Sequence, residues 1–97
     1  MLAERGELVE AVVHHLEAIR LKPNLGEAHN NLGVAYYKQG KMTEAADEFQ
    51  KATQLIPDNI ATWNNLGLAM QALGKPQEAA AAFQEAERRK AKSKQRD

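Results

Sequence analysis

The 97-residue sequence contains no cysteine, a single serine (Ser93) and no long apolar run. Without cysteine the chain can form neither disulfides nor thiolate zinc sites, so packing alone must stabilise its fold. With one serine and no glycine-rich phosphate loop, the sequence offers neither a Ser-His-Asp arrangement nor a nucleotide-binding motif. No segment approaches the roughly 18 apolar residues of a membrane-spanning helix. These absences predict no membrane span, no cofactor and no enzyme activity.

The sequence also lacks a net charge, because 13 Lys and Arg balance 13 Asp and Glu. The balance conceals a segregation: residues 1–87 hold 7 basic against 12 acidic residues, and residues 88–97 hold 6 against 1. An acidic body argues against a nucleic-acid-binding domain, whose affinity comes largely from clustered Lys and Arg. Only the basic tail could contact nucleic acid, anionic lipid or the acidic body of another copy. The alternative is a solubilising helix end, since cations there complement the helix dipole.

The first ten residues carry three glutamates and lack the apolar core of a secretory signal. The sequence therefore predicts no export. Together with the absence of cysteine, this favours a cytoplasmic location. Three histidines are present, but His14 and His15 project about 100° apart on a helix. His29 has no carboxylate or cysteine at ligand spacing in the sequence. We therefore predict packed or solvated histidines and no metal site.

What the sequence does contain is an internal repeat, because residues 26–59 match residues 60–93 at a fixed offset of 34. Thirteen positions are identical. The residues that recur 34 positions later are Asn30, Asn31, Leu32, Gly33, Ala35, Gly40, Lys41, Glu44, Ala45, Ala46, Phe49, Gln50 and Ala52. Stepping back by the same offset, a partial unit begins the chain with Gly6, Glu10, Ala11, Ala18, Leu21 and Pro23.

Each unit is interrupted at a glycine (Gly6, Gly40 or Gly74), and the first two units also end at a proline corner (Pro23-Asn24 and Pro57-Asp58-Asn59). Glycine supplies the left-handed conformation that ends many helices, and proline lacks the N–H that a helix interior needs. Between these stops the apolar residues follow helical spacing. We therefore predict helices over residues 7–21, 27–39, 42–55, 61–73 and 76–91. Gly33 and Gly67 fall inside predicted helices, which indicates close approach of a partner helix carrying the small residue Ala45 or Ala79. Leu32, Leu66, Phe49 and Phe83 would fill the layer between the helices.

The series Asn31-Leu32-Gly33, Tyr36, Gly40, Glu44-Ala45, Phe49, Ala52 and Pro57 resembles the tetratricopeptide repeat. The resemblance implies an all-α fold: a right-handed α-solenoid of antiparallel helical hairpins, about two and a half repeats long. The repeat domain would cover residues 1–93, with a partial unit at 1–25, full units at 26–59 and 60–93, and a basic tail at 94–97. The sequence departs from the family pattern at His15, His29, Met70 and Ala91. Because Ala91 stands where proline would recur, the last helix can continue into the basic tail.

In that family the first helix of each unit lines a concave groove, so the resemblance implies binding of a protein or peptide segment there. The implied groove residues are Glu27, Asn30, Asn31, Val34, Tyr37, Lys38, Ala61, Asn64, Asn65, Leu68, Gln71 and Ala72. A primary amide can engage both the C=O and the N–H of an extended peptide. Asn31 and Asn65 are thus similar to the asparagine ladder of the repeat superhelix of O-linked N-acetylglucosamine transferase. The alternative is that these asparagines are structural.

A second binding mode of the family, a carboxylate clamp for acidic chaperone tails, requires several basic residues in the groove. Ala61 and Asn65 stand where its basic pair would sit, and Lys38 alone is a poor substitute. The sequence therefore argues against this mode.

The amino end suggests an alternative role, because the partial unit leaves an apolar helix face without a full partner. The residues are Leu8, Val12, Leu16 and Ile19. Repeat arrays normally carry polar terminal surfaces. Either the chain is cut from a longer array, or another chain covers this face, which could make a homo-oligomer through the repeat ends.

Overall fold

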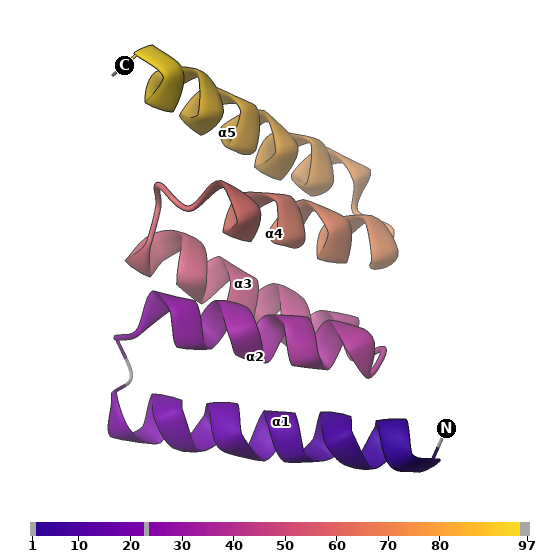
Figure 1. The fold of residues 1–97 in the computed structure, drawn as a ribbon. Helices are drawn as coiled ribbons and strands as arrows, with labels where there is room; N and C mark the ends of the chain where they lie inside the picture. Colours follow the sequence, from indigo (N-terminus) through magenta and orange to yellow (C-terminus); the bar gives the residue numbers. More distant parts are fainter. Residues whose placement is uncertain (1, 23, 96–97) are drawn as a thin grey trace.

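The computed structural model describes the backbone of residues 2–22 and 24–95 and the side chains of residues 9–22 and 24–93. Five helices follow one another in a single elongated stack of 44 × 31 × 19 Å (Figure 1). They are α1 (Leu2–Leu21), α2 (Gly26–Lys38), α3 (Met42–Leu55), α4 (Ile60–Ala72) and α5 (Pro76–Gln95). No strand occurs in the described backbone. The chain is therefore an all-α solenoid of helical hairpins, as the sequence predicted.

The two complete hairpins, α2–α3 and α4–α5, turn in the same way. Gly40 and Gly74 adopt positive φ values of 79° and 73°, which only glycine reaches without strain. In each turn the N–H of the following lysine donates back across the turn, from Lys41 to the Tyr36 carbonyl and from Lys75 to the Met70 carbonyl, both at 2.9 Å. This is the Schellman arrangement that ends a helix and reverses the chain.

The hairpins bury a core of small and aromatic side chains between them. Phe49 and Leu32 are 1% exposed, and Ala45 is completely buried. A Cβ atom placed on Gly33 would lie 2.5 Å from the Phe49 ring, and one on Gly67 would lie 2.6 Å from the Phe83 ring. The predicted close approach at both glycines is thus confirmed, because any side chain there would overlap the aromatic ring.

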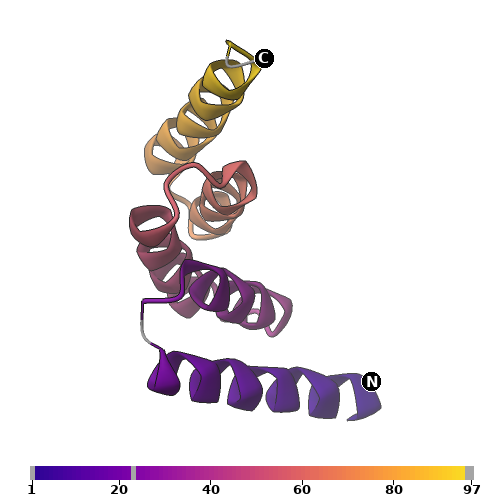
Figure 2. The ribbon, with the colours of Figure 1, turned by 60° about the vertical axis from the view of Figure 1, so that its left-hand side comes forward.

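Helix α1 differs from the prediction, which placed a stop at Gly6 and the start of the helix at residue 7. The helix instead runs without a break from Leu2 to Leu21. Glycine inside a helix costs only about 1 kcal/mol relative to alanine. At Gly40 and Gly74 the turn is held by two helices that pack against each other, whereas Gly6 lies within one continuous helix. Among the helices, α1 contacts only α2, and it lies apart from α3 (Figure 2).

The polar contacts include one buried pair that the sequence did not reveal. His29 of α2 is 6% exposed, and its Nδ1 lies 2.7 Å from Oε1 of Glu48 on α3. Spacing along the sequence did not show this partner, because it comes from the facing helix 19 residues away. The repeat carries Trp63 at the equivalent position, whose indole N–H donates to the Pro57 carbonyl at 2.7 Å. At this position, each unit therefore provides a hydrogen-bond partner for a ring nitrogen: a carboxylate for His29 and a main-chain carbonyl for Trp63.

At the far end of the stack, α5 continues to Gln95. This agrees with the absence of a proline at residue 91. Part of its basic segment is tied to the body. Arg89 donates to Asp58 at 3.0 Å and to Glu85 at 3.4 Å, and its guanidinium lies 5.7 Å from the centroid of the Trp63 ring. None of the described helices is long and apolar enough to cross a membrane.

Candidate functional site

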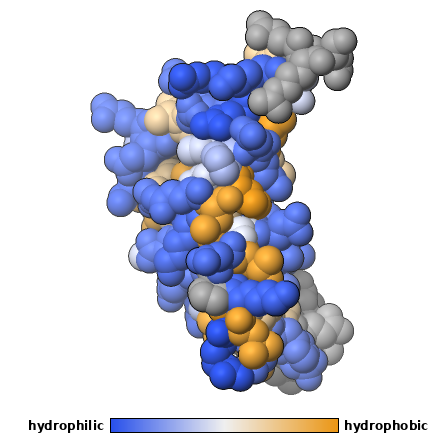
Figure 3. Space-filling model, turned by 90° about the vertical axis from the view of Figure 1, so that its left-hand side faces the viewer, coloured by the Kyte–Doolittle hydropathy of each residue, from blue (hydrophilic) through white to orange (hydrophobic). Residues whose placement is uncertain are grey.

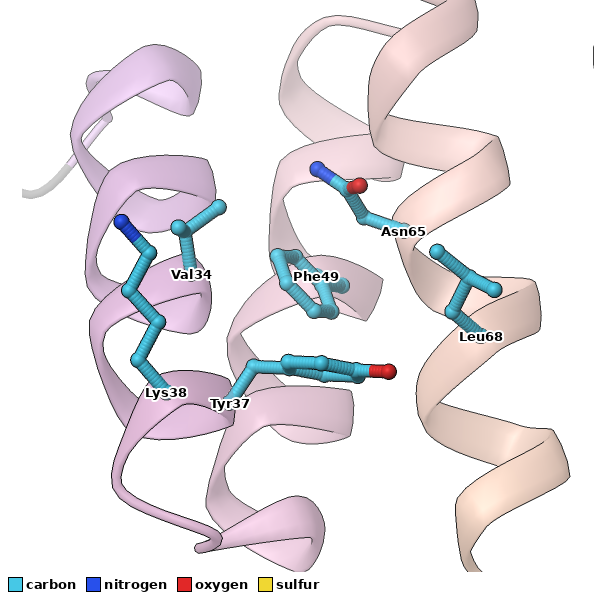
Figure 4. A pocket seen from close by; sticks show the side chains of 6 residues that line it. All are labelled: Val34, Tyr37, Lys38, Phe49, Asn65 and Leu68. Carbon is cyan, nitrogen blue, oxygen red and sulfur yellow. The ribbon is translucent and has the colours of Figure 1, made fainter.

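A hollow of about 220 Å³ opens between the first helices of the two complete hairpins. Helix α2 contributes Val34, Tyr37 and Lys38, α3 contributes Phe49, and α4 contributes Asn65 and Leu68 (Figure 4). We call this the Phe49 hollow. Five of its six residues belong to the groove set predicted from the sequence. Phe49 is not among them, because its periodicity predicts a core residue and does not show that a core ring also lines a surface depression.

The Phe49 hollow is apolar inside and polar at its edge. Phe49 is buried, and Leu68 is 43% exposed. The Tyr37 ring lies across the hollow with its hydroxyl directed towards α4 (Figure 4). Lys38 carries the only charge among the lining residues. Such a site can take an apolar side chain and offer hydrogen bonds and one cation around it.

One of the two predicted ladder asparagines is already engaged within the protein. The Asn65 amide donates to Oδ1 of Asn30 on α2 at 3.1 Å. An amide has two N–H groups and one carbonyl oxygen, so Asn65 keeps one donor and its acceptor for a ligand. Asn31, the repeat equivalent of Asn65, is exposed. The amides therefore serve the packing of α2 on α4 at least in part.

A second hollow of about 270 Å³ lies between α1 and α2. We call it the α1–α2 hollow. Its lining residues are Ala11 and His15 of α1 and Asn31, Val34, Ala35 and Lys38 of α2. Val34 and Lys38 line both hollows, so the two depressions adjoin across α2. Three of its residues, Ala11, His15 and Ala35, lie outside the groove set predicted from the sequence.

The remaining predicted groove residues line neither of these hollows. Glu27, Ala61, Asn64, Gln71 and Ala72 are exposed along α2 and α4, and Asn30 is half-buried beneath its bond with Asn65.

The four residues predicted for self-association divide into two groups. Val12 and Ile19 are half-buried, whereas Leu16 is 46% exposed; the side chain of Leu8 lies outside the described residues. Because α1 packs only on α2, the half-buried pair faces that helix. Leu16 instead lies at helical spacing with Val9 and Val13, which are 54% and 58% exposed. We call these three residues the α1 stripe.

Other apolar and charged surface groups lie near the turns. Leu21, Leu25 and Leu55 are 67%, 44% and 39% exposed on the side of the α1–α2 and α3–α4 connections, where apolar atoms alternate with polar ones (Figure 3). Next to the α1 stripe, Arg20 pairs with Glu17 at 2.5 Å and 3.2 Å and lowers the pKa of that carboxyl. The pair is exposed, so it adds little to stability. The described residues contain no group of three potential metal ligands.

The repeat matches two models of known protein families. A model described as tetratricopeptide repeat matches residues 24–92, and a second, described as TPR repeat, matches residues 1–40. The chain belongs to the tetratricopeptide repeat family. A search of curated protein sequences finds no significant match.

Solved structures of tetratricopeptide proteins superpose closely. A crystal structure of MamA matches with a TM-score of 0.88 at 26% identity, over 92% of this chain and 52% of that one. The first tetratricopeptide domain of Spaghetti (RPAP3), bound to the HSP90 peptide SRMEEVD, matches with a TM-score of 0.83 at 21% identity, over 89% of this chain and 68% of that one. This chain thus spans about half the length of the MamA structure.

Proposed function

We propose that this chain is a protein–protein interaction module that binds an extended peptide segment along α2 and α4. The observation that carries the proposal is the Phe49 hollow, an open apolar depression bounded by side chains of three helices. It would hold one apolar side chain of the peptide. Membership of the tetratricopeptide family and the peptide-bound state of the RPAP3 relative support this reading.

The polar groups around the hollow would bind the peptide main chain. The free donor and acceptor of Asn65 lie beside the hollow, and Asn31 lies one unit earlier beside the α1–α2 hollow. The proposed ladder therefore has two rungs, of which Asn65 also holds α2 to α4. If Asn31→Ala combined with Asn65→Ala leaves the affinity for a selected peptide unchanged, the ladder is wrong and only the hollow remains.

The test begins with selection of short random peptides displayed on phage against the full chain. We expect the selected peptides to share an aliphatic or aromatic residue and to bind Leu68→Asp at least about tenfold more weakly, since a carboxylate would enter the apolar hollow. Gln84→Asp, at an exposed position of α5, is the matched control. Equal binding to wild type and Leu68→Asp would place the peptide elsewhere and contradict the proposal.

A second candidate function is self-association, favoured by the exposure of the α1 stripe. The repeat equivalents of Val9, Val13 and Leu16 are the polar residues Thr43, Asp47 and Gln50 of α3. Helix α1 therefore carries apolar side chains at three neighbouring positions of a face that is polar on α3. Such an apolar face suits contact with the α1 helix of a second copy. Light scattering should show a mass that rises with concentration and falls to the monomer in Leu16→Asp. A monomer at all concentrations would exclude this function.

A further inference from the structure

We infer that the peptide bound in the Phe49 hollow carries one acidic residue, two positions away from its apolar residue, whose carboxylate pairs with Lys38. The inference rests on the proposed peptide binding and states which peptides the site selects. This single pair differs from the family's carboxylate clamp, whose basic residues would stand where this chain has Ala61 and Asn65.

The apolar part of the Phe49 hollow has room for one side chain. Its volume of about 220 Å³ lies below the roughly 300–1,000 Å³ of small-molecule pockets. Its apolar walls come from Val34, Leu68 and the buried ring of Phe49, and none of them carries a charge. An aliphatic or aromatic side chain therefore suits the interior, and a charged group can be bound only at the edge.

Lys38, at that edge, is a cation without a partner. Its amine makes no ion pair, hydrogen bond or ring contact with the part of the chain that the structure describes. Five other cations lie within 3.9 Å of a carboxylate: Arg20, Lys51, Lys75, Arg88 and Arg89. Lys38 thus keeps its three N–H donors for a ligand, and a carboxylate is the acceptor that complements its charge.

The openness of this edge does not depend on what precedes α2. The repeat equivalents of Val34 and Lys38 on α4 are Leu68 and Ala72. Both are exposed, although the hairpin α2–α3 precedes α4. A hairpin packed before α2 in the same way would therefore leave Lys38 open to the groove.

The geometry of an extended peptide sets the spacing between the two contacts. Side chains on one face of an extended chain are two residues apart, which is about 6–7 Å. Lys38 lies one helical turn, about 5.4 Å, beyond Val34 on α2, and its flexible side chain runs beside Val34 (Figure 4). The residue two positions from the apolar one therefore comes within reach of the amine. A second acidic residue would find no further cation among the lining residues.

The experiment uses the peptides that phage display selects against the full chain, synthesised with both ends blocked so that no terminal charge replaces the side-chain carboxylate. We expect Asp or Glu to recur two positions from the apolar residue. Changing it to the amide, or Lys38→Gln in the protein, should each weaken binding about two- to fivefold at low salt. Because both changes break the same pair, their combination should weaken binding no further.

Lys22→Gln is the matched control, because it removes the same charge beyond the other end of α2 from an exposed residue that lines neither hollow. It should leave the affinity unchanged. Circular dichroism of each variant confirms that the helices are retained.

The outcomes separate this inference from the proposed function. Peptides that need Leu68 but lack a recurring acidic residue, or that bind Lys38→Gln as tightly as wild type, would overturn the inference and leave the proposed function standing. An acidic residue whose effect persists in Lys38→Gln would assign the carboxylate to another group and overturn it too. If every peptide binds Leu68→Asp as it binds wild type, the proposed function fails and the inference fails with it.

Discussion

At the scale of single residues, this fold depends on a few positions where a side chain of one helix packs directly against a glycine of its neighbour. Gly33 and the Phe49 ring are the tightest such pair, and the same ring is the floor of the Phe49 hollow. A small change at Gly33 therefore affects both stability and the shape of the candidate site. The spacing of the repeat predicted close helix approach at Gly33 but not that the Phe49 ring makes the contact.

We predict that Gly33→Ala destabilises the protein by about 1 kcal/mol or more. The alanine Cβ would lie 2.5 Å from a ring that is 1% exposed, and overpacking of this kind costs about 1–3 kcal/mol. That exceeds the helix-propensity gain of about 0.5–1 kcal/mol. Urea unfolding followed by circular dichroism measures the difference. Gly33→Ala with Phe49→Leu should recover part of the loss, and a Gly33→Ala protein more stable than wild type would refute the packing argument.

We predict that Glu48→Ala destabilises the chain by about 1–3 kcal/mol, because it removes a carboxylate hydrogen-bonded to the buried His29 ring. The neighbouring Asp47→Ala, at an exposed position, should change stability by no more than about 0.5 kcal/mol. A double-mutant cycle with His29→Ala isolates the pair. A coupling energy near zero would mean that the two side chains contribute independently.

At the scale of the helices, the 34-residue period and its glycine and proline stops predicted α2, α3 and α4 to within one residue at each end. They gave the start of α5 correctly and its end four residues too early. They failed at Gly6, because a glycine permits a turn but does not require one, and α1 continues through it. They also missed the His29–Glu48 pair and the two hollows. The pair and the hollows depend on which side chains of neighbouring helices face each other. Periodicity within one helix does not specify this.

We predict that α1 exchanges its amide hydrogens fastest among the five helices. It packs on one neighbour only, and its apolar side chains Val9, Val13 and Leu16 are largely exposed, whereas α3 lies between α2 and α4. Local opening free energies follow buried contact of this kind. Hydrogen–deuterium exchange with mass spectrometry gives the comparison. Protection of residues 9–21 equal to that of residues 42–55 would show that α1 is fastened more firmly than its packing indicates.

At the scale of the whole molecule, the distribution of charge determines whether an acidic ligand can bind along α2 and α4. Residues 1–87 carry more acidic than basic side chains. The Phe49 hollow has one cation, Lys38, among its lining residues. Part of the basic segment is committed elsewhere, since Arg89 pairs with Asp58 and Glu85. A strongly acidic ligand would therefore meet little positive charge at the groove.

We predict that the chain does not bind the peptide SRMEEVD, which the RPAP3 relative holds, with a dissociation constant below about 100 μM. Charge-assisted bonds to carboxylates need several basic groups, and Ala61 and Asn65 stand where the family's clamp would supply them. Ala61→Lys with Asn65→Arg should gain binding that weakens with salt. Isothermal titration calorimetry tests both proteins, and tight binding by the wild type would contradict the prediction.

The bond from Asn65 to Asn30 has a consequence for how such a molecule can be lengthened. The bond has a direction: Asn65 donates and Asn30 accepts, and their repeat equivalents, Asn31 and Asn64, are exposed. Inserting a whole 34-residue unit with the same two asparagines after Asn59 would allow one more such bond in the same direction. An insertion of one or two residues inside α2 or α4 would instead rotate one amide away from the other, because each helical residue turns the chain by about 100°.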